Sequence, residues 1–166
     1  MVAPRRTIRD GIVVGLIGYA AVAVFYSVFD QLAARPPLYT VDLLGKAVFR
    51  GLRDPGVLFF PLQSDVAAIF WYNALHFVIA LVIGVIVTSL VASAEQQPSR
   101  RSLVRFVIAA GFLVTVIVVG VLTAPMRPVL PWWSIVVANA LATLLAGMYL
   151  VRQRPGLWHR LALVTD

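Results

Sequence analysis

Four long stretches of this chain contain no charged side chain, and they constrain its fold more than any other feature. They cover residues 11–29, 66–94, 106–124 and 132–151. An uncharged apolar run of about 20 residues is long enough to cross the hydrocarbon core of a bilayer as a helix. Because 61% of the residues are hydrophobic and only 13% are charged, little chain remains for a separate soluble domain. We therefore predict an integral membrane protein in which residues 1–166 form a single membrane domain.

The spans are predicted to be helices and not the strands of a β-barrel. A barrel strand is about 10 residues long and alternates polar with apolar side chains, whereas these runs are longer and apolar on every side. Inside hydrocarbon, a helix satisfies its own backbone hydrogen bonds. The predicted fold class is all-α, a polytopic four-transmembrane-helix bundle.

Basic side chains are distributed unevenly over the predicted loops. One side of the membrane would hold both termini and the loop between spans two and three, with Arg5, Arg6, Arg9, Arg100, Arg101, Arg105, Arg152, Arg154 and Arg160. The other side would hold Arg35, Lys46, Arg50, Arg53 and Arg127, offset by Asp30, Asp42, Asp54 and Asp65. Since loops rich in Lys and Arg stay in the cytoplasm, we expect both termini there. The net charge of +7 follows the span ends and forms no single basic stripe, so no nucleic-acid partner is expected.

The first span has a second interpretation. Its basic start, MVAPRRTIR, followed by an apolar run and Ala21-Val22-Ala23, is also typical of a secretory signal peptide. The apolar run is long for that purpose, so we expect an uncleaved first span.

Small residues recur at helical spacing in the first and fourth spans. They are Gly11, Gly15 and Gly18 in the first span, and Ala138, Ala142 and Ala146 in the fourth. Small side chains at such spacing let a second helix backbone approach closely, which is how helices associate in lipid. We predict that both faces are helix-packing surfaces, either within the chain or against a partner.

The only sizeable extramembrane segment is the outer loop at residues 30–65. Its middle, at about residues 40–53, is predicted to form an amphipathic helix that lies in the membrane interface. The expected polar side consists of Asp42, Lys46, Arg50 and Arg53, and the expected apolar side of Val41, Leu44, Val48 and Leu52. Asp42 and Lys46 have the i,i+4 spacing of an ion pair. The apolar residues 57–60 that follow would dip into lipid or touch a partner protein.

The spans contain few groups capable of chemistry. No Asp, Glu, Lys or Arg lies in the central part of any span, and ion-coupled carriers depend on such residues. Enzyme chemistry is not expected either, because His76 has no carboxylate at its depth and the chain has no cysteine. A metal site needs several ligands, and none is predicted.

The polar residues of interest are Asn73 and His76 in the second span and Asn139 in the fourth. Asn73 and His76 are at i and i+3, on one face of the helix. His76 and Asn139 would both lie about 8–9 Å below an aromatic pair, at 1.5 Å per residue, and so share one layer. Three interpretations stay open for this layer: a structural hydrogen-bond cluster, ligation of a haem, chlorophyll or quinone by His76, and a substrate or lipid-headgroup contact.

Three stretches carry a resemblance to a known family: RPPLYTVDLLGKAVF after the first span, YNALHFV in the second, and WSIVVANALATLLAGMYL in the fourth. With its RP…LLG loop, its Leu-His-Phe and its Asn-containing, Ala-rich last span, the chain resembles small uncharacterised four-span proteins of bacterial inner membranes. The resemblance covers most of the chain and implies a four-helix bundle in the inner membrane. It implies no catalytic activity.

The expected function is that of a non-catalytic accessory or structural subunit of a larger bacterial membrane complex, with a respiratory or photosynthetic complex as the expected host. Its partners would be membrane lipids and other membrane-protein subunits. One alternative is an electron-transfer module that binds haem, chlorophyll or quinone at His76, with Asn73 and Asn139 nearby. Another is a small carrier or lipid-handling protein whose cavity is lined by the His76/Asn139 layer.

Overall fold

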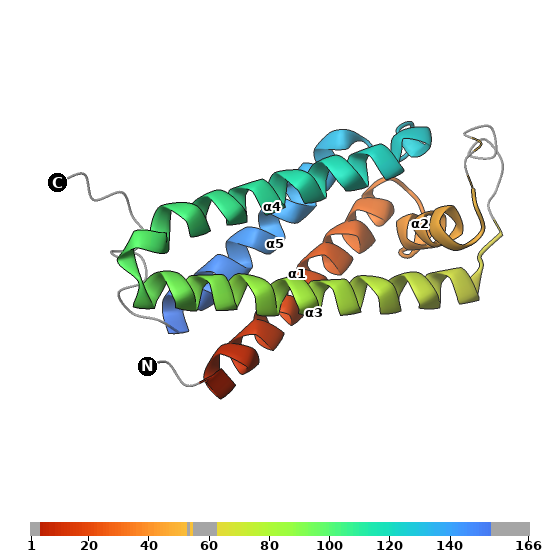
Figure 1. The fold of residues 1–166 in the computed structure, drawn as a ribbon. Helices are drawn as coiled ribbons and strands as arrows, with labels where there is room; N and C mark the ends of the chain where they lie inside the picture. Colours follow the sequence, from red (N-terminus) through yellow and green to blue (C-terminus); the bar gives the residue numbers. More distant parts are fainter. Residues whose placement is uncertain (1–3, 53, 55–62, 154–166) are drawn as a thin grey trace.

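The computed structural model describes residues 4–52, 54 and 63–153, and all regular structure in these residues is helical (Figure 1). The elements are α1 Pro4–Leu32, α2 Tyr39–Phe49, α3 Val66–Gln96, η2 Pro98–Arg100, α4 Arg101–Leu122, η3 Ala124–Met126 and α5 Trp132–Gln153. Four of them, α1, α3, α4 and α5, are long and apolar enough to cross a membrane. The prediction of an all-helical chain with four apolar helices of membrane-spanning length is confirmed for the described residues.

The helix ends lie further out than the uncharged runs suggested. α1 begins at Pro4 and ends at Leu32, so it includes Asp10 and Asp30 beyond either end of the predicted span. α3 begins at Val66 because Asp65 is its N-cap, with the Asp65 carboxylate accepting a hydrogen bond from the backbone N–H of Ala68 at 2.9 Å. Charged residues mark the ends of the apolar run. The helix itself can continue past them for as long as its backbone hydrogen bonds are satisfied.

α1 lies at the centre of the arrangement, with its most extensive contacts to α3 and further contacts to α5 and α2 (Figure 1). The start of α1, the end of α5 and the α3–α4 connection lie at one end of the bundle, and α2 and the α4–α5 turn lie at the other. A hydrogen bond at the first end joins the Arg6 guanidinium to the Gln153 carbonyl at 3.1 Å. This arrangement agrees with the predicted grouping of the loops into two sets.

Glycines determine how closely α1 and α3 approach. A Cβ added to Gly11 would lie 2.7 Å from the Cα of Val85, and one added to Gly15 would lie 2.7 Å from the Ala80 carbonyl oxygen. On the facing helix, a Cβ at Gly84 would collide with the backbone of Gly11 and Gly15. The small face of α1 is therefore used within the chain.

The other predicted packing residues differ in position. Gly18 is not part of this contact, since a Cβ there would meet nothing within 4 Å. In α5, Ala138 is fully buried in a core with Tyr26, Leu43 and Met126. Ala146 packs against a second core near the other end, whereas Ala142 is only partly buried.

α4 is the most loosely attached of the long helices. Its buried residues are Val104, Val116 and Gly120. At Gly120 the indole ring of Trp132 from α5 lies directly on the backbone, in space that any side chain at that position would fill. The remaining circumference of α4 carries mostly exposed apolar side chains.

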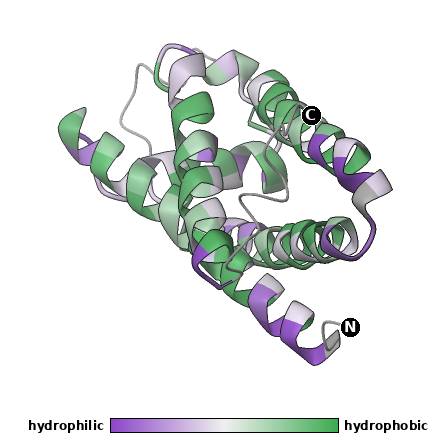
Figure 2. Cartoon of the chain, turned by 90° about the vertical axis from the view of Figure 1, so that its left-hand side faces the viewer, coloured by the Kyte–Doolittle hydropathy of each residue, from purple (hydrophilic) through white to green (hydrophobic). Residues whose placement is uncertain are grey.

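Apolar side chains cover the outside of the bundle as well as its core. Figure 2 shows hydrophobic residues along most of each long helix and hydrophilic residues at the start of α1. Extensive exposed apolar surface is unfavourable in water and favourable against lipid tails. The exposed Leu, Val, Ile and Phe residues are therefore consistent with a chain that crosses the membrane several times.

α2 buries residues from both of its predicted sides, Leu44 from the apolar side and Asp42 from the polar side. The helix ends at Phe49, and Gly51 follows in the left-handed region with φ +68°. Asp42, expected on the polar outer side, is only 5% exposed, whereas Val48, expected on the apolar inner side, is 47% exposed. The reason is a contact with α3, since the backbone of Gly45 lies directly on the Ala68 carbonyl and sets the buried face. Residues 57–60 lie outside the described residues.

Candidate functional site

The predicted polar residues of α3 lie in an aromatic cluster at the α1–α3 contact. The Tyr19 hydroxyl of α1 donates a hydrogen bond to Asn73 Oδ1 at 3.2 Å, and Asn73 Nδ2 donates to the Ile69 carbonyl at 2.9 Å. The imidazole of His76 lies between two phenol rings, with ring centroids 5.2 Å from Tyr19 and 6.3 Å from Tyr72. Tyr19 therefore joins Asn73 and His76 into one cluster, although it was not among the predicted site residues.

Asn139 does not join this cluster. Its Nδ2 donates to the Ile135 carbonyl at 2.8 Å, one turn back in α5, and its own carbonyl accepts from the Thr143 hydroxyl at 2.8 Å. α1 packs against both α3 and α5, and no hydrogen bond or ring contact links His76 with Asn139 among the described residues. The two residues were predicted to share a layer, and that shared depth stays a prediction.

The predicted depths of His76 and Asn139 were measured from two aromatic pairs, Trp71-Tyr72 and Trp132-Trp133. The two side chains of each pair lie in different environments. Trp71 and Trp133 are 57% and 55% exposed, as expected of side chains at a membrane surface. Tyr72 instead packs against the core around Tyr26, and Trp132 covers Gly120. In each pair one member is therefore exposed, and the other packs against the rest of the chain.

The densest group of polar contacts lies at the α2 end of the bundle, and we call it the polar cap. Its members are Asp30, Arg35, Thr40, Asp42, Lys46, Arg50 and Asp65. Several of these charges were expected to be solvated loop residues, yet Asp30 and Asp42 are buried. The polar cap connects α1, α2, the start of α3 and the α4–α5 turn.

Asp30 provides the N-terminal cap of α2 from a distance in sequence. Its carboxylate accepts from the Thr40 backbone N–H at 2.8 Å and from the Thr40 hydroxyl at 2.6 Å, and it is completely buried. Leu38, at the N-cap position itself, has no side chain able to do this. A carboxylate at a helix N-terminus satisfies free N–H groups and is favoured by the helix dipole. A signal in the sequence could have predicted this cap: Asp30 stands at the end of a span, shortly before a helix whose own N-cap residue, Leu38, cannot accept a hydrogen bond with its side chain.

Arg35 connects this region to the turn between η3 and α5. Its guanidinium donates to the Val129 carbonyl at 2.7 Å and lies 5.2 Å from the centre of the Tyr39 ring. Burial raises the pKa of the Tyr39 hydroxyl, and the positive charge of Arg35 opposes that change. One side chain thus joins two turns that are far apart in the sequence.

One ion pair and two hydrogen bonds join α2 to the start of α3. Lys46 Nζ lies 2.6 Å from Asp42 Oδ2, so the predicted i,i+4 pair is present, and Lys46 also donates to the Gln63 carbonyl. Asp42 Oδ1 accepts from the Asp65 backbone N–H at 3.1 Å. Arg50 Nε donates to Asp65 Oδ2 at 2.9 Å, and this hydrogen bond holds the pKa of the Asp65 carboxyl below its usual range.

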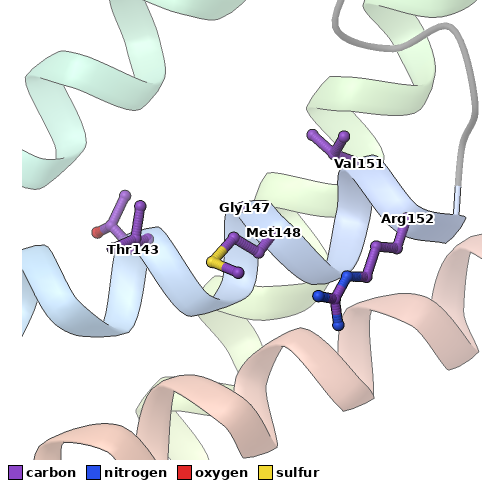
Figure 3. A pocket seen from close by; sticks show the side chains of 6 residues that line it. Thr143, Gly147, Met148, Val151 and Arg152 are labelled. Carbon is purple, nitrogen blue, oxygen red and sulfur yellow. The ribbon is translucent and has the colours of Figure 1, made fainter.

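A shallow apolar groove of about 500 Å³ runs along α5 at the opposite end of the bundle (Figure 3). It is lined by Thr143, Leu144, Gly147, Met148, Val151 and Arg152. His76 is not among the lining residues, so this groove is not the cavity that the carrier hypothesis requires at the His76/Asn139 layer.

Metal chemistry has no evident site in the described ranges. Within residues 4–52, 54 and 63–153, no three His, Cys, Asp or Glu side chains gather closely enough to hold an ion. The group best suited to a cofactor is the His76 imidazole, because neither ring nitrogen makes a hydrogen bond to another described residue.

The polar cap and the aromatic cluster are thus the two places where this chain concentrates polar side chains. Comparison of the chain with protein-family models, with curated proteins and with solved structures finds no match.

Proposed function

We propose that this chain is a non-catalytic accessory or structural subunit of a larger membrane complex, most simply a respiratory or photosynthetic complex of a bacterial inner membrane. In this proposal both termini lie in the cytoplasm, and α2 lies in the outer interface. The single observation that carries the proposal is the polar cap, which fixes the shape of a surface outside the spans.

The polar cap is more elaborate than a connecting loop requires. A loop that only joins two spans can be short and solvated, whereas here a buried carboxylate, a guanidinium, one ion pair and two hydrogen bonds to the start of α3 hold α2 in one position. Fixing a surface before binding lowers the entropy lost when a partner binds. Val48 and Phe49 of α2 are exposed apolar residues on this surface and would contact the partner.

The polar side chains inside the spans support the same proposal. Asn73, Thr115, Asn139 and Thr143 each donate to the carbonyl four residues earlier in their own helix. Such a bond uses the side-chain donor within its own helix, so that donor is not offered to a substrate. The loosely attached α4, with apolar side chains around most of its circumference, offers a further face for another subunit's helix.

Gentle purification tests the proposal. The tagged chain, extracted from its native membrane in mild detergent, should bring down partner proteins in fixed stoichiometry. A charge on the exposed face of α2, as in Val48→Asp, should reduce the recovered partners several-fold. Ser99→Asp, at an exposed position at the other end of the bundle, is the matched control and should leave recovery unchanged. A solitary monodisperse protein would contradict the proposal.

His76 supports a second candidate, an electron-transfer module that holds haem, chlorophyll or quinone. The favouring observation is an imidazole that lies between Tyr19 and Tyr72 and whose nitrogens have no hydrogen-bond partner among the described residues. Neutral imidazole nitrogen is a common ligand of haem iron. A visible spectrum or extractable quinone that is lost in His76→Ala but kept in Leu75→Ala would establish this function, and a colourless, quinone-free preparation would remove it.

A further inference from the structure

The groove on α5 combines an apolar floor with a charged end. Gly147 opens its floor, because a Cβ at that position would meet nothing within 4 Å. The hydroxyl of Thr143 already donates to the Asn139 carbonyl, so this wall presents no free donor to the groove. Leu144, Met148 and Val151 supply the apolar lining. A groove of this kind is suited to a hydrocarbon chain and not to a polar ligand.

Two guanidinium groups from different helices lie at one end of the groove. Arg152 is part of its lining and is exposed, and Figure 3 shows its side chain extending from α5 toward α1. Arg6 of α1 reaches the same place, since it donates to the carbonyl of Gln153, the next residue after Arg152. Arg6 has a structural role at the end of α5, where carbonyls are free. Arg152 makes no hydrogen bond or ion pair with another described residue.

The length of the groove indicates which occupant fits. From Thr143 to Arg152 the helix rises about 14 Å at 1.5 Å per residue, which is close to half of the roughly 30 Å hydrocarbon core. One acyl chain extends over one leaflet, whereas a transmembrane helix of a partner needs a face that continues across both. The charged end lies where the apolar run of α5 ends, at the level expected for a lipid phosphate.

We propose that this groove binds an anionic phospholipid, with one acyl chain against Gly147 and the headgroup phosphate at Arg152 and Arg6. The chemistry is the familiar one of basic residues beside a transmembrane helix end that attract anionic headgroups. The proposal does not depend on the function proposed above, because the groove and the polar cap lie at opposite ends of the bundle.

Native mass spectrometry of the full chain, titrated with phosphatidylglycerol or with phosphatidylcholine, tests this proposal. The wild-type chain should bind phosphatidylglycerol more tightly. Arg152→Gln should weaken that binding severalfold, and adding Arg6→Gln should bring the loss to about tenfold or more, as two phosphate contacts predict. Gly147→Leu fills the groove and should weaken binding of both lipids.

Two matched variants exclude general effects. Arg100→Gln removes an exposed guanidinium from the same end of the bundle but away from the groove. Gly111→Leu adds the same side chain at an exposed glycine of α4 that also has open space around it. Both should bind lipid like the wild type, and circular dichroism should show unchanged helix content in all variants.

The proposal is overturned if Arg152→Gln keeps the full preference for phosphatidylglycerol, or if Arg100→Gln loses as much as Arg152→Gln. It is also overturned if Gly147→Leu binds normally. If the groove instead receives a partner helix or another segment of this chain, filling it with Gly147→Leu would leave lipid binding unchanged.

Discussion

At the scale of single residues, the acidic side chains determine more of the structure than their number suggests. Asp30 and Asp42 were predicted to be surface charges that balance nearby basic residues, and both are buried with named partners. The sequence could not reveal this, because the partner of Asp30 is ten residues away at Thr40 and depends on how the chain turns between them. The Asp42–Lys46 pair could be predicted, since it follows from helix spacing alone.

Replacing Asp30 tests its role as the cap of α2. Asp30→Ala leaves the buried N–H and hydroxyl of Thr40 without their acceptor, which should lower the free energy of unfolding by about 1–3 kcal/mol. Asp30→Asn keeps one acceptor oxygen and should cost less. The measurement is unfolding by denaturing detergent added to the protein in mild detergent. Gln31→Ala, at the exposed neighbouring position, should stay within about 0.5 kcal/mol of the wild type, and an equal loss in both variants would refute the cap.

Asp65 gives a prediction about pH. Its pKa lies below the usual 3.8 in the folded chain, mainly because of the hydrogen bond from Arg50. A lowered carboxyl pKa stabilises the fold above the unfolded pKa, and that contribution is lost as the pH falls through the folded pKa. Carboxyl carbon NMR should detect titration of Asp65 below pH 3.8. Arg50→Gln should raise the pKa, whereas Arg127→Gln, at the same end of the bundle, should not. An unchanged pKa in Arg50→Gln would show that the pair is absent in solution.

At the scale of elements, the spans could be predicted and the orientation of the shorter helix could not. Absence of charge over about 20 residues identifies a span by itself. Burial of Asp42 from the predicted polar side of α2 was not predictable, because the buried side is chosen by one close approach, Gly45 on the Ala68 carbonyl. The packing of Gly11 and Gly15 followed the spacing rule, but a Cβ at Gly18, at similar spacing, would meet nothing within 4 Å. Spacing predicts which faces can pack and not which of their residues are in close contact.

Gly84 tests the crossing of α1 and α3. In Gly84→Ala the new methyl group would meet the backbone of Gly11 and Gly15, so the helices must separate. Overpacking of this kind should cost about 1–3 kcal/mol. Gly111→Ala, which has open space around it, should not lower the free energy of unfolding, because Ala favours a helix over Gly by about 0.5–1 kcal/mol. The same detergent titration measures both, and equal stability of the two variants would contradict the crossing.

At the scale of the whole molecule, the two ends of the bundle have different chemistry. One end carries the arginines of α1, η2, α4 and α5, and the other carries the polar cap with its nearly balanced charges. The sequence predicted this division, because it depends only on counting charges between spans. The position of α1 between α3 and α5 was not predictable, since contacts between spans depend on side-chain shapes that hydropathy does not describe.

The chain contains no cysteine, so single cysteines can test the proposed orientation directly. Gln63→Cys and Ser99→Cys introduce thiols at exposed positions on opposite ends of the bundle. With both termini in the cytoplasm, a membrane-impermeant maleimide should label Gln63→Cys in intact spheroplasts. It should label Ser99→Cys only after the membrane is opened. The reverse pattern would invert the topology.

The central position of α1 also has a consequence for biosynthesis. Chains are made from the N-terminus, so α1 is made before its neighbours α3 and α5, which are the second and the fourth of the four long helices in the described residues. Until α3 arrives, the glycine face of α1 has no helix beside it. The earliest of the four long helices is therefore enclosed only after the latest of them has been made.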